Sequence, residues 1–407
     1  MKVGALLVLL LLILAQGLLA QQSQPLPDRW LYYQTNLLVD ENVDRLEGIW
    51  RRAAAAGYTG VVITDSKFGR LNEMPERYFA NCERVKALAA ELHLEIIPGV
   101  CPIGYSEELL CQDPNLAEGM PVKEALFVVE GGEAWPVADP PVALNGADFA
   151  DLAQWDWKDD TVTADAGAAL MRDPHGQNAR IVQRVKVAPF RQYHLSARVK
   201  TQDFVGEPRV TVLGNQSLCY QNLGVKPTQD WTVHHITFNS LGNTEVGLYF
   251  GCWDGQTGSL WWDDATIEET PLLNLLRREG APFTVKRDDT GELLVEGKDF
   301  EPVVDPLMGT VPWTGNYDVW HEPPIIRTDL PDGTRLRISC YHAVLIYDSQ
   351  VTICPSELKT VELLAGQIAR VHALWQAKTY FMMHDELRVL NWDDSCQRRH
   401  LTPGGES

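Results

Sequence analysis

The feature that most constrains the fold is a change in the pattern of predicted strands and helices along the chain. Between residues 28 and 100, three short apolar segments alternate with two amphipathic segments, whereas residues 145–269 contain short alternating strands and no convincing helix. Strands that alternate with helices predict a parallel α/β sheet, and closely spaced strands separated by Gly, Asn and Asp predict a β-sandwich. We therefore expect one α/β part and one all-β part.

The α/β part opens with expected strands over residues 30–36, 60–64 and 94–100. The helices expected between them, over residues 40–57 and 75–92, carry apolar residues at intervals of three and four. Polar or aromatic groups follow each strand, at the edge where parallel sheets build ligand sites. The same groups are common helix caps and turn residues, so both interpretations stay open. The candidate ligand-binding residues in this part are Tyr33, Asn36 and Asp65.

The all-β part contains several sequence features of one known type of module. They are the pair Trp155 and Trp157, the segments YHLSARVK (193–200) and WTVHHITF (231–238), and the closing WWDDATI (261–267). With these features, residues 145–269 resemble the carbohydrate-binding modules of families 4 and 9. The resemblance implies a jelly-roll β-sandwich and a carbohydrate ligand.

Aromatic side chains of this part are candidates for sugar binding, because flat apolar rings suit stacking on pyranose rings. The candidates are Trp155, Trp157, Trp231, Trp253 and Trp261, and packing in the core is the alternative for each. Asp263 and Asp264 offer oxygen ligands for a structural calcium ion, or merely end a strand.

Residues 270–332 are expected to connect the sandwich to the C-terminal part of the chain. The segment 284–295 predicts a hairpin around an Asp-Thr-Gly turn. The segment 312–324 is rich in Trp, Tyr, His and acidic residues. It predicts either a functional loop over a pocket or a connector that packs two domains together.

The α/β pattern resumes in residues 333–407. A strand is expected at Arg335–Tyr341, and a long helix capped by Ser356 leads to an apolar strand that begins at Tyr380 and ends in His384-Asp385-Glu386. Ionisable groups at the end of a buried strand are costly for stability and well placed for chemistry. Because α/β segments stand on both sides of the sandwich, we expect it to be an insertion into one α/β domain, whose first part is residues 28–140.

Together these features resemble the (β/α)8 glycoside hydrolases, and most closely the family 20 β-N-acetylhexosaminidases. In that family a barrel strand ends in Gly-Gly-Asp-Glu or a near variant, after a helix that begins at a Pro-containing turn. Here Cys354-Pro355-Ser356-Glu357 opens the helix, and Met383-His384-Asp385-Glu386 ends the strand. The resemblance implies that Glu386 is the general acid, that Asp385 orients the 2-acetamido group, and that no cofactor is needed. Consecutive strand residues point to opposite faces, so both carboxylates share a pocket only where the strand breaks into a loop.

The further residues expected to line this pocket are Tyr341, His342, His384 and Arg388. A protein of another class, a non-catalytic carbohydrate-binding or surface-interaction protein, remains an alternative in which the sandwich is the working part. Metal-dependent hydrolysis by His321, Glu322, His342 and Asp385 has no ligand spacing to support it. A closed barrel needs eight strands and only four or five can be counted, so we expect a truncated barrel. A half-barrel that pairs with another protein part, and a fold of another kind, are the alternatives.

The N-terminus has the features of a signal peptide over residues 1–20. Lys2 precedes the apolar run Ala5–Leu14, and Leu18-Leu19-Ala20 stands before Gln21 as a cleavage site. An uncleaved signal anchor is the alternative. We expect a secreted or periplasmic protein with no membrane span after cleavage.

Charge and cysteine content restrict the partners and the compartment. The formal net charge is −20 and no Lys/Arg run occurs, which argues against nucleic acid as a partner. The eight cysteines fit an oxidising compartment, and none forms Cys-x-x-Cys, so a structural zinc site has no support from spacing. Cys101 with Cys111 and Cys219 with Cys252 are near enough in sequence to pair, and buried free thiols are equally compatible. The oligomeric state stays open.

Overall fold

The computed structural model describes residues 26–172, 176–384 and 386–399. The expected signal peptide, residues 1–20, lies outside the described residues. The chain divides into two compact units. Among the described residues, the first unit holds those up to residue 65 with 73–99 and 372–381, and the second holds those in 66–72, in 100–371 and from 382 on.

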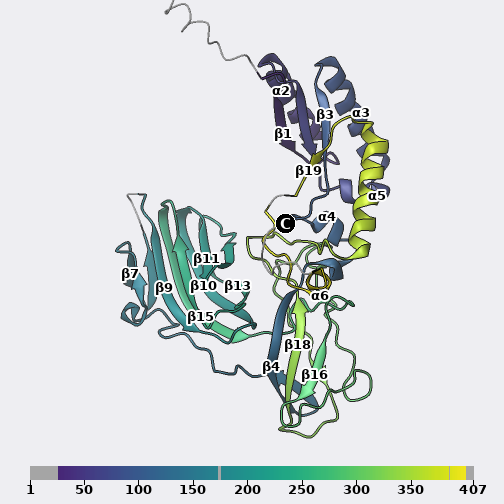
Figure 1. The fold of residues 1–407 in the computed structure, drawn as a ribbon. Coiled ribbons are helices and arrows are strands. Elements are labelled where there is room, and N and C mark those ends of the chain that lie inside the picture. The colour runs from purple at the N-terminus through teal and green to yellow at the C-terminus, as the bar shows by residue number, and fades with distance from the viewer. Residues whose placement is uncertain (1–25, 173–175, 385, 400–407) are drawn as a thin grey trace, which may run out of the picture. The chain divides into compact units, whose positions relative to one another are not determined.

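The first unit is built on a parallel sheet, whose strands are drawn in Figure 1. Strand β1 (Trp30–Gln34) pairs in parallel with β2 (Gly60–Thr64), and β2 pairs in parallel with β3 (Glu95–Val100). Helix α2 (Asp40–Ala55) follows β1, and helix α3 (Glu76–Glu91) follows β2. The expected order of strand, helix, strand, helix and strand is confirmed.

The sequence explains these elements locally. All five residues of β2 are buried, as expected for a strand covered on both faces. Helix α2 buries Val43, Leu46 and Trp50 along one stripe, at the spacing that the sequence predicts. Its C-terminal end is followed by Gly57, whose φ of 82° lies in the left-handed region that glycine adopts without strain.

No closed barrel of eight parallel strands is formed by the residues that the structure describes. The parallel sheet has four strands in the order β1-β2-β3-β19, with β19 at Phe381–Met382. The segment expected to resume the parallel pattern forms β18 (Arg335–His342), which instead pairs antiparallel with its neighbours. Burial alternates residue by residue along β18, which is the pattern of a strand with one face in a core and one outside it.

The second unit contains an antiparallel sheet with strands from both sides of the sandwich. Its order is β16-β18-β4-β5-β17, where β16 is Thr284–Arg287, β4 is Met120–Glu130, β5 is Glu133–Pro136 and β17 is Ile326–Arg327. One face buries Val122, Phe127, Leu336 and Ile338 in a common core. The predicted hairpin at 284–295 is confirmed by the antiparallel bridge between Lys286 and Leu293.

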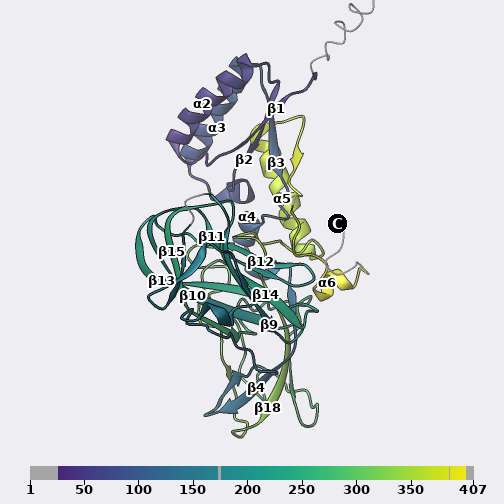
Figure 2. The ribbon, with the colours of Figure 1, turned by 90° about the vertical axis from the view of Figure 1, so that its left-hand side faces the viewer.

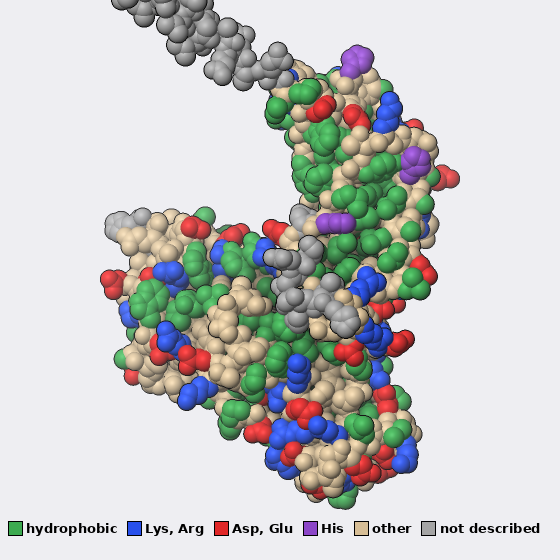
Figure 3. Space-filling model, viewed as in Figure 1, with side chains coloured by type: hydrophobic (Ala, Val, Ile, Leu, Met, Phe, Trp, Pro, Cys, Tyr) green, Lys and Arg blue, Asp and Glu red, His purple; other side chains and the backbone are tan. Residues whose placement is uncertain are grey.

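The outer side chains of β16 and β18 are strongly charged. Lys/Arg and Asp/Glu side chains gather over this end of the molecule in Figure 3. The guanidinium groups of Arg335 and Arg337 each lie 2.8 Å from the carboxylate of Asp288. The hydrogen bonds from Arg337 and Arg335 hold the pKa of Asp288 below its usual value, so the carboxylate stays ionised.

The all-β part is a sandwich of two five-stranded antiparallel sheets. Their orders are β13-β10-β15-β8-β7 and β12-β11-β14-β9-β6. The strands are β6 (Trp157–Lys158), β7 (Val162–Asp165), β8 (Ala168–Met171), β9 (Ala179–Lys186), β10 (Gln192–Val205), β11 (Pro208–Leu213), β12 (Ser217–Asn222), β13 (Gln229–Asn239), β14 (Glu245–Cys252) and β15 (Thr257–Glu269). Figure 2 shows β12, β11, β14 and β9 side by side.

Aromatic side chains fill the space between the two sheets. The ring of Trp155 stacks on Phe149 at a centroid distance of 4.6 Å and meets Phe250 edge-on at 5.6 Å. Trp262 contacts the same Phe250 ring from the other sheet, at 5.4 Å. These residues belong to one continuous buried cluster, so the sandwich has a core of its own.

Buried hydrogen bonds join the sandwich to the antiparallel sheet. The side-chain amide of Asn239 on β13 donates to the carbonyl of Pro121 at 3.0 Å and lies 2.8 Å from Nε2 of His342 on β18. The guanidinium of Arg191 donates to the carbonyl of Glu124 at 2.9 Å. Polar groups buried in this way are costly to separate, so the sandwich is not merely tethered to its neighbour.

Short helices and one long helix complete the described chain. The long one is α5 (Leu358–Trp375), and the predicted helix after Ser356 is thereby confirmed. The short ones are α4 (Glu107–Leu110), α6 (Asp394–Gln397) and the 3-10 turns Phe68–Glu73, Pro114–Leu116 and Leu152–Gln154. Within the described ranges, no helix has the length and apolar character needed to cross a bilayer.

Candidate functional site

Three of the predicted ligand-binding residues belong to the first unit. The carboxylate of Asp65 is buried, accepts the backbone N–H of Leu37 at 2.9 Å and accepts the hydroxyl of Tyr78 at 3.0 Å. Asn36 accepts the backbone N–H of Leu38 in a local turn before α2. Tyr33 is half-buried on β1. The contacts of Asp65 and Asn36 order the start of α2, which is a structural task.

Tyr341 and His342 lie next to each other on β18 and point to opposite faces. The hydroxyl of Tyr341 donates to Asp394 at 2.7 Å. The ring of His342 is fully buried, with Nε2 against the Asn239 amide and Nδ1 3.1 Å from the carbonyl of Ala343. Burial lowers the pKa of His342 to about 4, so its ring is neutral at ordinary pH.

Glu386 lies at the centre of a small polar cluster. Its carboxylate accepts the hydroxyl of Tyr105 and lies 3.3 Å from the guanidinium of Arg388. Gln350 donates to the backbone carbonyl of Glu386 and accepts Nε of Arg388 at 2.8 Å. Glu386 and Arg388, two residues apart in the sequence, are therefore in contact. Asp385 lies outside the described residues, and His384 is exposed.

The backbone geometry and charge of Glu386 limit its chemistry. Strand β19 ends at Met382, and Glu386 adopts a left-handed backbone with a φ of 55°. The hydrogen bond from Tyr105 and the charge of Arg388 lower the pKa of the Glu386 carboxyl. A carboxylate that is ionised at neutral pH suits nucleophilic or charge-stabilising work, whereas a general acid needs a raised pKa.

Aromatic and guanidinium groups connect this cluster to the sandwich. The guanidinium of Arg388 lies 4.5 Å from the ring centroid of Tyr347. Tyr347 stacks on Tyr220 of β12 at 4.5 Å with an interplanar angle of 13°. Arg209 of β11 covers the Tyr220 ring at 4.2 Å. Main-chain hydrogen bonds fix this junction, since Tyr220 donates to the carbonyl of Ile346 at 2.6 Å.

The outer face of the sheet β12-β11-β14-β9-β6 carries a row of side chains at one level. The register aligns, from strand to strand, Trp157, Val182, Tyr249, Thr211 and Tyr220. Partners across a sheet share a face, and successive residues in a strand alternate faces. Because Phe250 points into the core, Tyr249 and its row face outward.

A shallow pocket lies at one end of this row. Its volume is about 480 Å³, and its lining residues are Asp156, Trp157, Val182, Arg184 and Tyr249. The indole of Trp157 is 47% exposed, whereas Val182 is buried and forms the floor. The pocket thus combines an exposed flat ring, a second aromatic ring and one charged group of each sign.

The guanidinium of Arg180 lies 5.2 Å from the Trp157 ring centroid, and the other tryptophan candidates stand beside cations or in the core. Trp155 is part of the hydrophobic core. The structure therefore supports the packing alternative for this residue. Trp253 lies between the guanidinium groups of Arg180 and Arg209, at 6.0 and 5.0 Å. On the opposite sheet, Trp231 is covered by Arg198 and Trp261 by Lys200.

The aspartates considered for calcium have an arginine partner. Asp264 pairs with Arg198 at 2.5 Å, and Asp263 accepts the backbone N–H of Asp264 at 2.9 Å. The positive charge near these carboxylates therefore comes from a side chain. His321, weighed for metal binding, is paired with Asp305 at 2.9 Å.

The sequence gives no sign of a further group of residues that could ligate a metal ion. Glu118, Cys354, Asp393 and Cys396 are all buried, and one ligand atom of each lies within 4.8 Å of the others. Burial and the charge of Asp393 raise the pKa of Glu118 well above its usual value. The two cysteines are 42 residues apart, so no Cys-x-x-Cys signal exists to reveal them. All eight cysteines fall within the described ranges and carry free thiols, including the two pairs considered for disulfides.

Comparison with known proteins finds similarity only at the level of parts. No protein-family model matches the sequence, and no curated protein does. A family 4 carbohydrate-binding module is 18% identical over 28% of this chain and 77% of its own, with a TM-score of 0.24. A family 16 carbohydrate-binding module is 20% identical over 31% of this chain and 97% of its own, with a TM-score of 0.24.

A larger enzyme also shares a part with this chain. An arabinose-bound family 51 α-L-arabinofuranosidase is 13% identical over 38% of this chain and only 30% of its own, with a TM-score of 0.24. The structural neighbours thus include carbohydrate-binding modules and a glycosidase, and a cyclase is similar over 36% of this chain with a TM-score of 0.23. Because the TM-scores are low, these likenesses assign neither a family nor a function.

Proposed function

We propose that this protein binds a neutral carbohydrate chain on the outer face of the sheet β12-β11-β14-β9-β6. The observation that carries the proposal is the pocket in which the exposed Trp157 ring stands beside Tyr249. An indole ring exposed to water costs free energy, and stacking on the apolar face of a pyranose ring lowers that free energy. Asp156 and Arg184 supply an acceptor and donors for sugar hydroxyls at the rim.

The accessible part of the face is the end at Trp157 and Tyr249. Val182 and Thr211 of the row are buried, and the Tyr220 ring is covered by Tyr347 and Arg209. The formal charge of −20 disfavours a polyanionic ligand, which would be repelled at long range. A neutral sugar unit of a polysaccharide suits this end of the face. The signal-peptide features of the N-terminus support a place of action outside the cytoplasm.

The second candidate function is hydrolysis of the bound chain. The path Tyr220, Tyr347, Arg388 and Glu386 supports it, because aromatic rings lead from the proposed binding face to a carboxylate. In this proposal the protein is similar to family 20 glycoside hydrolases, and its parallel sheet belongs to a (β/α)8-type catalytic domain.

The protonation state of the Glu386 carboxyl decides its role in that reaction. With its pKa lowered, Glu386 starts as the carboxylate that stabilises the oxocarbenium-like centre. The proton for the leaving oxygen then comes from another group, so Glu386 would not be the general acid that the family 20 resemblance implies, with Asp385 as the residue that orients the 2-acetamido group. No cofactor takes part.

Affinity electrophoresis against neutral polysaccharides tests the binding proposal. The native protein is run in gels that contain xylan, β-glucan, galactan or mannan. At least one of these polysaccharides should slow its migration. Trp157→Ala should weaken that retardation by about tenfold or more, as for other exposed aromatic anchors. Trp231→Ala is the matched control, since Trp231 lies on the opposite sheet and should leave retardation unchanged. Equal retardation of the native protein and Trp157→Ala would exclude this face.

A further inference from the structure

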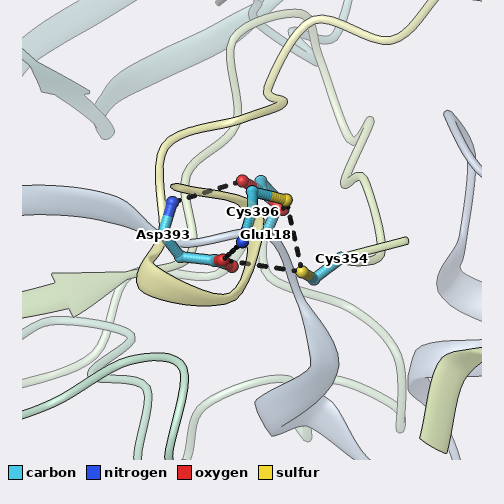
Figure 4. Close-up of side chains that lie close together, drawn as sticks. All are labelled: Glu118, Cys354, Asp393 and Cys396. Carbon is cyan, nitrogen blue, oxygen red and sulfur yellow. Dashed lines mark hydrogen bonds between the residues drawn. The ribbon is translucent and has the colours of Figure 1, made fainter. Parts of the chain in front are cut away.

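Three separate segments bring four metal-ligating side chains together in the interior of the second unit. Glu118 follows the turn Pro114–Leu116, Cys354 precedes helix α5, and Asp393 and Cys396 lie at the start and middle of α6. Figure 4 shows the four side chains pointing toward one another. Glu118 is 2% exposed, and the other three are 0% exposed. The group is closed to solvent by the protein itself.

Three of the six distances within the group are close to the edges of a tetrahedron around zinc, and all six are within 4.8 Å. Bonds of about 2.3 Å to sulfur and 2.1 Å to oxygen place two sulfur ligands about 3.8 Å apart, and sulfur and oxygen ligands about 3.6 Å apart. The two Sγ atoms of Cys354 and Cys396 are 3.7 Å apart. The distance from Cys354 Sγ to Asp393 Oδ1 is 3.6 Å, and that from Cys396 Sγ to Glu118 Oε2 is 3.4 Å.

Surrounding groups hold each carboxylate with one oxygen turned toward the sulfurs. Glu118 Oε1 accepts the backbone N–H of Trp392 at 2.9 Å, while its Oε2 faces Cys396. Asp393 Oδ2 is paired with Arg278 at 2.6 Å, while its Oδ1 faces Cys354. Such contacts to the second oxygen are the usual means by which proteins orient metal-ligating carboxylates.

The acidic side chains around the group are held by one arginine and by hydrogen bonds. Arg278 is shared between Asp393 and Glu357, at 2.6 and 2.8 Å. Glu118 Oε2 accepts from the thiol of Cys396, a weak donor whose place a metal ion would take.

We propose that Glu118, Cys354, Asp393 and Cys396 bind one zinc ion in a closed, structural site. On binding, Zn²⁺ enters, the two thiols and any carboxyl ligand that is protonated lose their protons to solvent, and two Zn–S bonds form with two Zn–O bonds. The two thiolates select a soft ion such as zinc over calcium or magnesium. Four protein ligands leave no open position, so the ion holds segments together and does not activate water.

The site has a clear mechanical effect within the second unit. It ties the residues around Glu118, the start of α5 and the C-terminal segment at α6 to one point. The C-terminal segment includes Trp392, which lies a short way along the chain from Glu386. Zinc binding therefore orders this segment, and the inference stands whether or not the protein acts on carbohydrate.

The test uses the full chain, purified without a metal-affinity step and dialysed against a small excess of zinc. Elemental analysis should find about one zinc ion per chain. Cys354→Ser and Cys396→Ser should each lower the zinc content by about tenfold or more at limiting free zinc. Cys340→Ser is the matched control, because Cys340 is equally buried and belongs to a different core. It should keep the full content.

A spectroscopic measurement avoids dependence on the variants. Cobalt(II) added to the native protein should produce the intense thiolate-to-cobalt charge-transfer absorption of a tetrahedral site, and zinc should abolish it. Removal of zinc by a chelator should lower the melting temperature. A native protein that takes up neither ion overturns the proposal. So does a disulfide between Cys354 and Cys396, detected by mass spectrometry of the unreduced protein.

Discussion

Trp155 and Trp157 are separated by one residue, yet their indole rings have opposite environments. Trp155 stacks on Phe149 at 4.6 Å inside the sandwich core, whereas Trp157 is 47% exposed at the pocket on the outer face. Residue 157 begins strand β6, and its register with Val182 of β9 fixes the face on which its side chain lies. One indole therefore stabilises the sandwich, and the other is available to a ligand.

Substitution should separate these two roles. Trp155→Ala removes a buried ring and should lower the free energy of unfolding by about 3–5 kcal/mol. Trp157→Ala should change it by less than about 1 kcal/mol, because little buried contact is lost. Denaturant unfolding followed by circular dichroism measures both. A large loss of stability in Trp157→Ala would contradict the assignment of its ring to the surface.

Glu386→Gln should abolish hydrolysis if the second candidate function holds. The change removes a negative charge while keeping the shape of the side chain and a partner for Tyr105. Hydrolysis of aryl glycosides, including N-acetylhexosaminides, should fall by about 10²-fold or more. Glu292→Gln, an exposed residue of the 284–295 hairpin, is the control and should be fully active.

An unchanged rate in Glu386→Gln would remove this residue from the reaction. Retardation by polysaccharide should meanwhile survive in the same variant, because the proposed binding face lies on the sandwich. Binding without hydrolysis in the native protein would favour the non-catalytic alternative.

His342 should make the protein less stable in acid. Burial lowers the pKa of its ring to about 4 from 6.5, so the unfolded chain takes up a proton that the folded chain refuses between these values. The contribution is fully present above pH 6.5 and is lost as the pH falls toward 4, by at most about 3 kcal/mol. His342→Gln keeps an acceptor for Asn239 and should flatten this part of the pH profile. Unfolding measured across that range, native against variant, gives the difference, and parallel profiles would contradict the prediction.

Arg278 should be essential for stability. Its guanidinium joins Asp393, whose side chain is 0% exposed, to Glu357, and Arg278→Met would leave a buried carboxylate without its cation. The free energy of unfolding should fall by about 3–5 kcal/mol. Arg398→Met is the matched control, since its pair with Glu279 is exposed and should contribute less than about 1 kcal/mol. Equal effects of the two changes in thermal unfolding would contradict the prediction.

The sequence predicts those elements whose burial is encoded locally. Strand β2, with five buried residues, and helix α2, with its stripe at Leu46 and Trp50, follow directly from the pattern. Strand β18 was expected in the parallel sheet, although its alternating burial is typical of an antiparallel one. The strand pattern is visible in the sequence, whereas the partner strand is chosen by packing far along the chain.

The candidate sites depend even more on distant contacts. Glu386 was identified from its own segment, but its partners Tyr105 and Gln350 come from other loops. Cys354 and Cys396 have unremarkable surroundings in the sequence and meet only in the folded chain. Residue types thus indicate which chemistry is available. The packing of distant loops against one another decides which of these residues come together in a site.

The antiparallel sheet that joins β4 to β18 has a consequence for how the chain folds during synthesis. The backbone N–H of Glu124 on β4 donates to the hydroxyl of Ser339 on β18, and these residues are 215 positions apart. Strand β4 leaves the ribosome well before its partner exists, and its open edge invites pairing with other chains. Folding of the sandwich in the interval draws the two ends of that long loop together and lowers the entropy cost of closing it. The module proposed to recognise carbohydrate would then also guide the assembly of the sheet beside it.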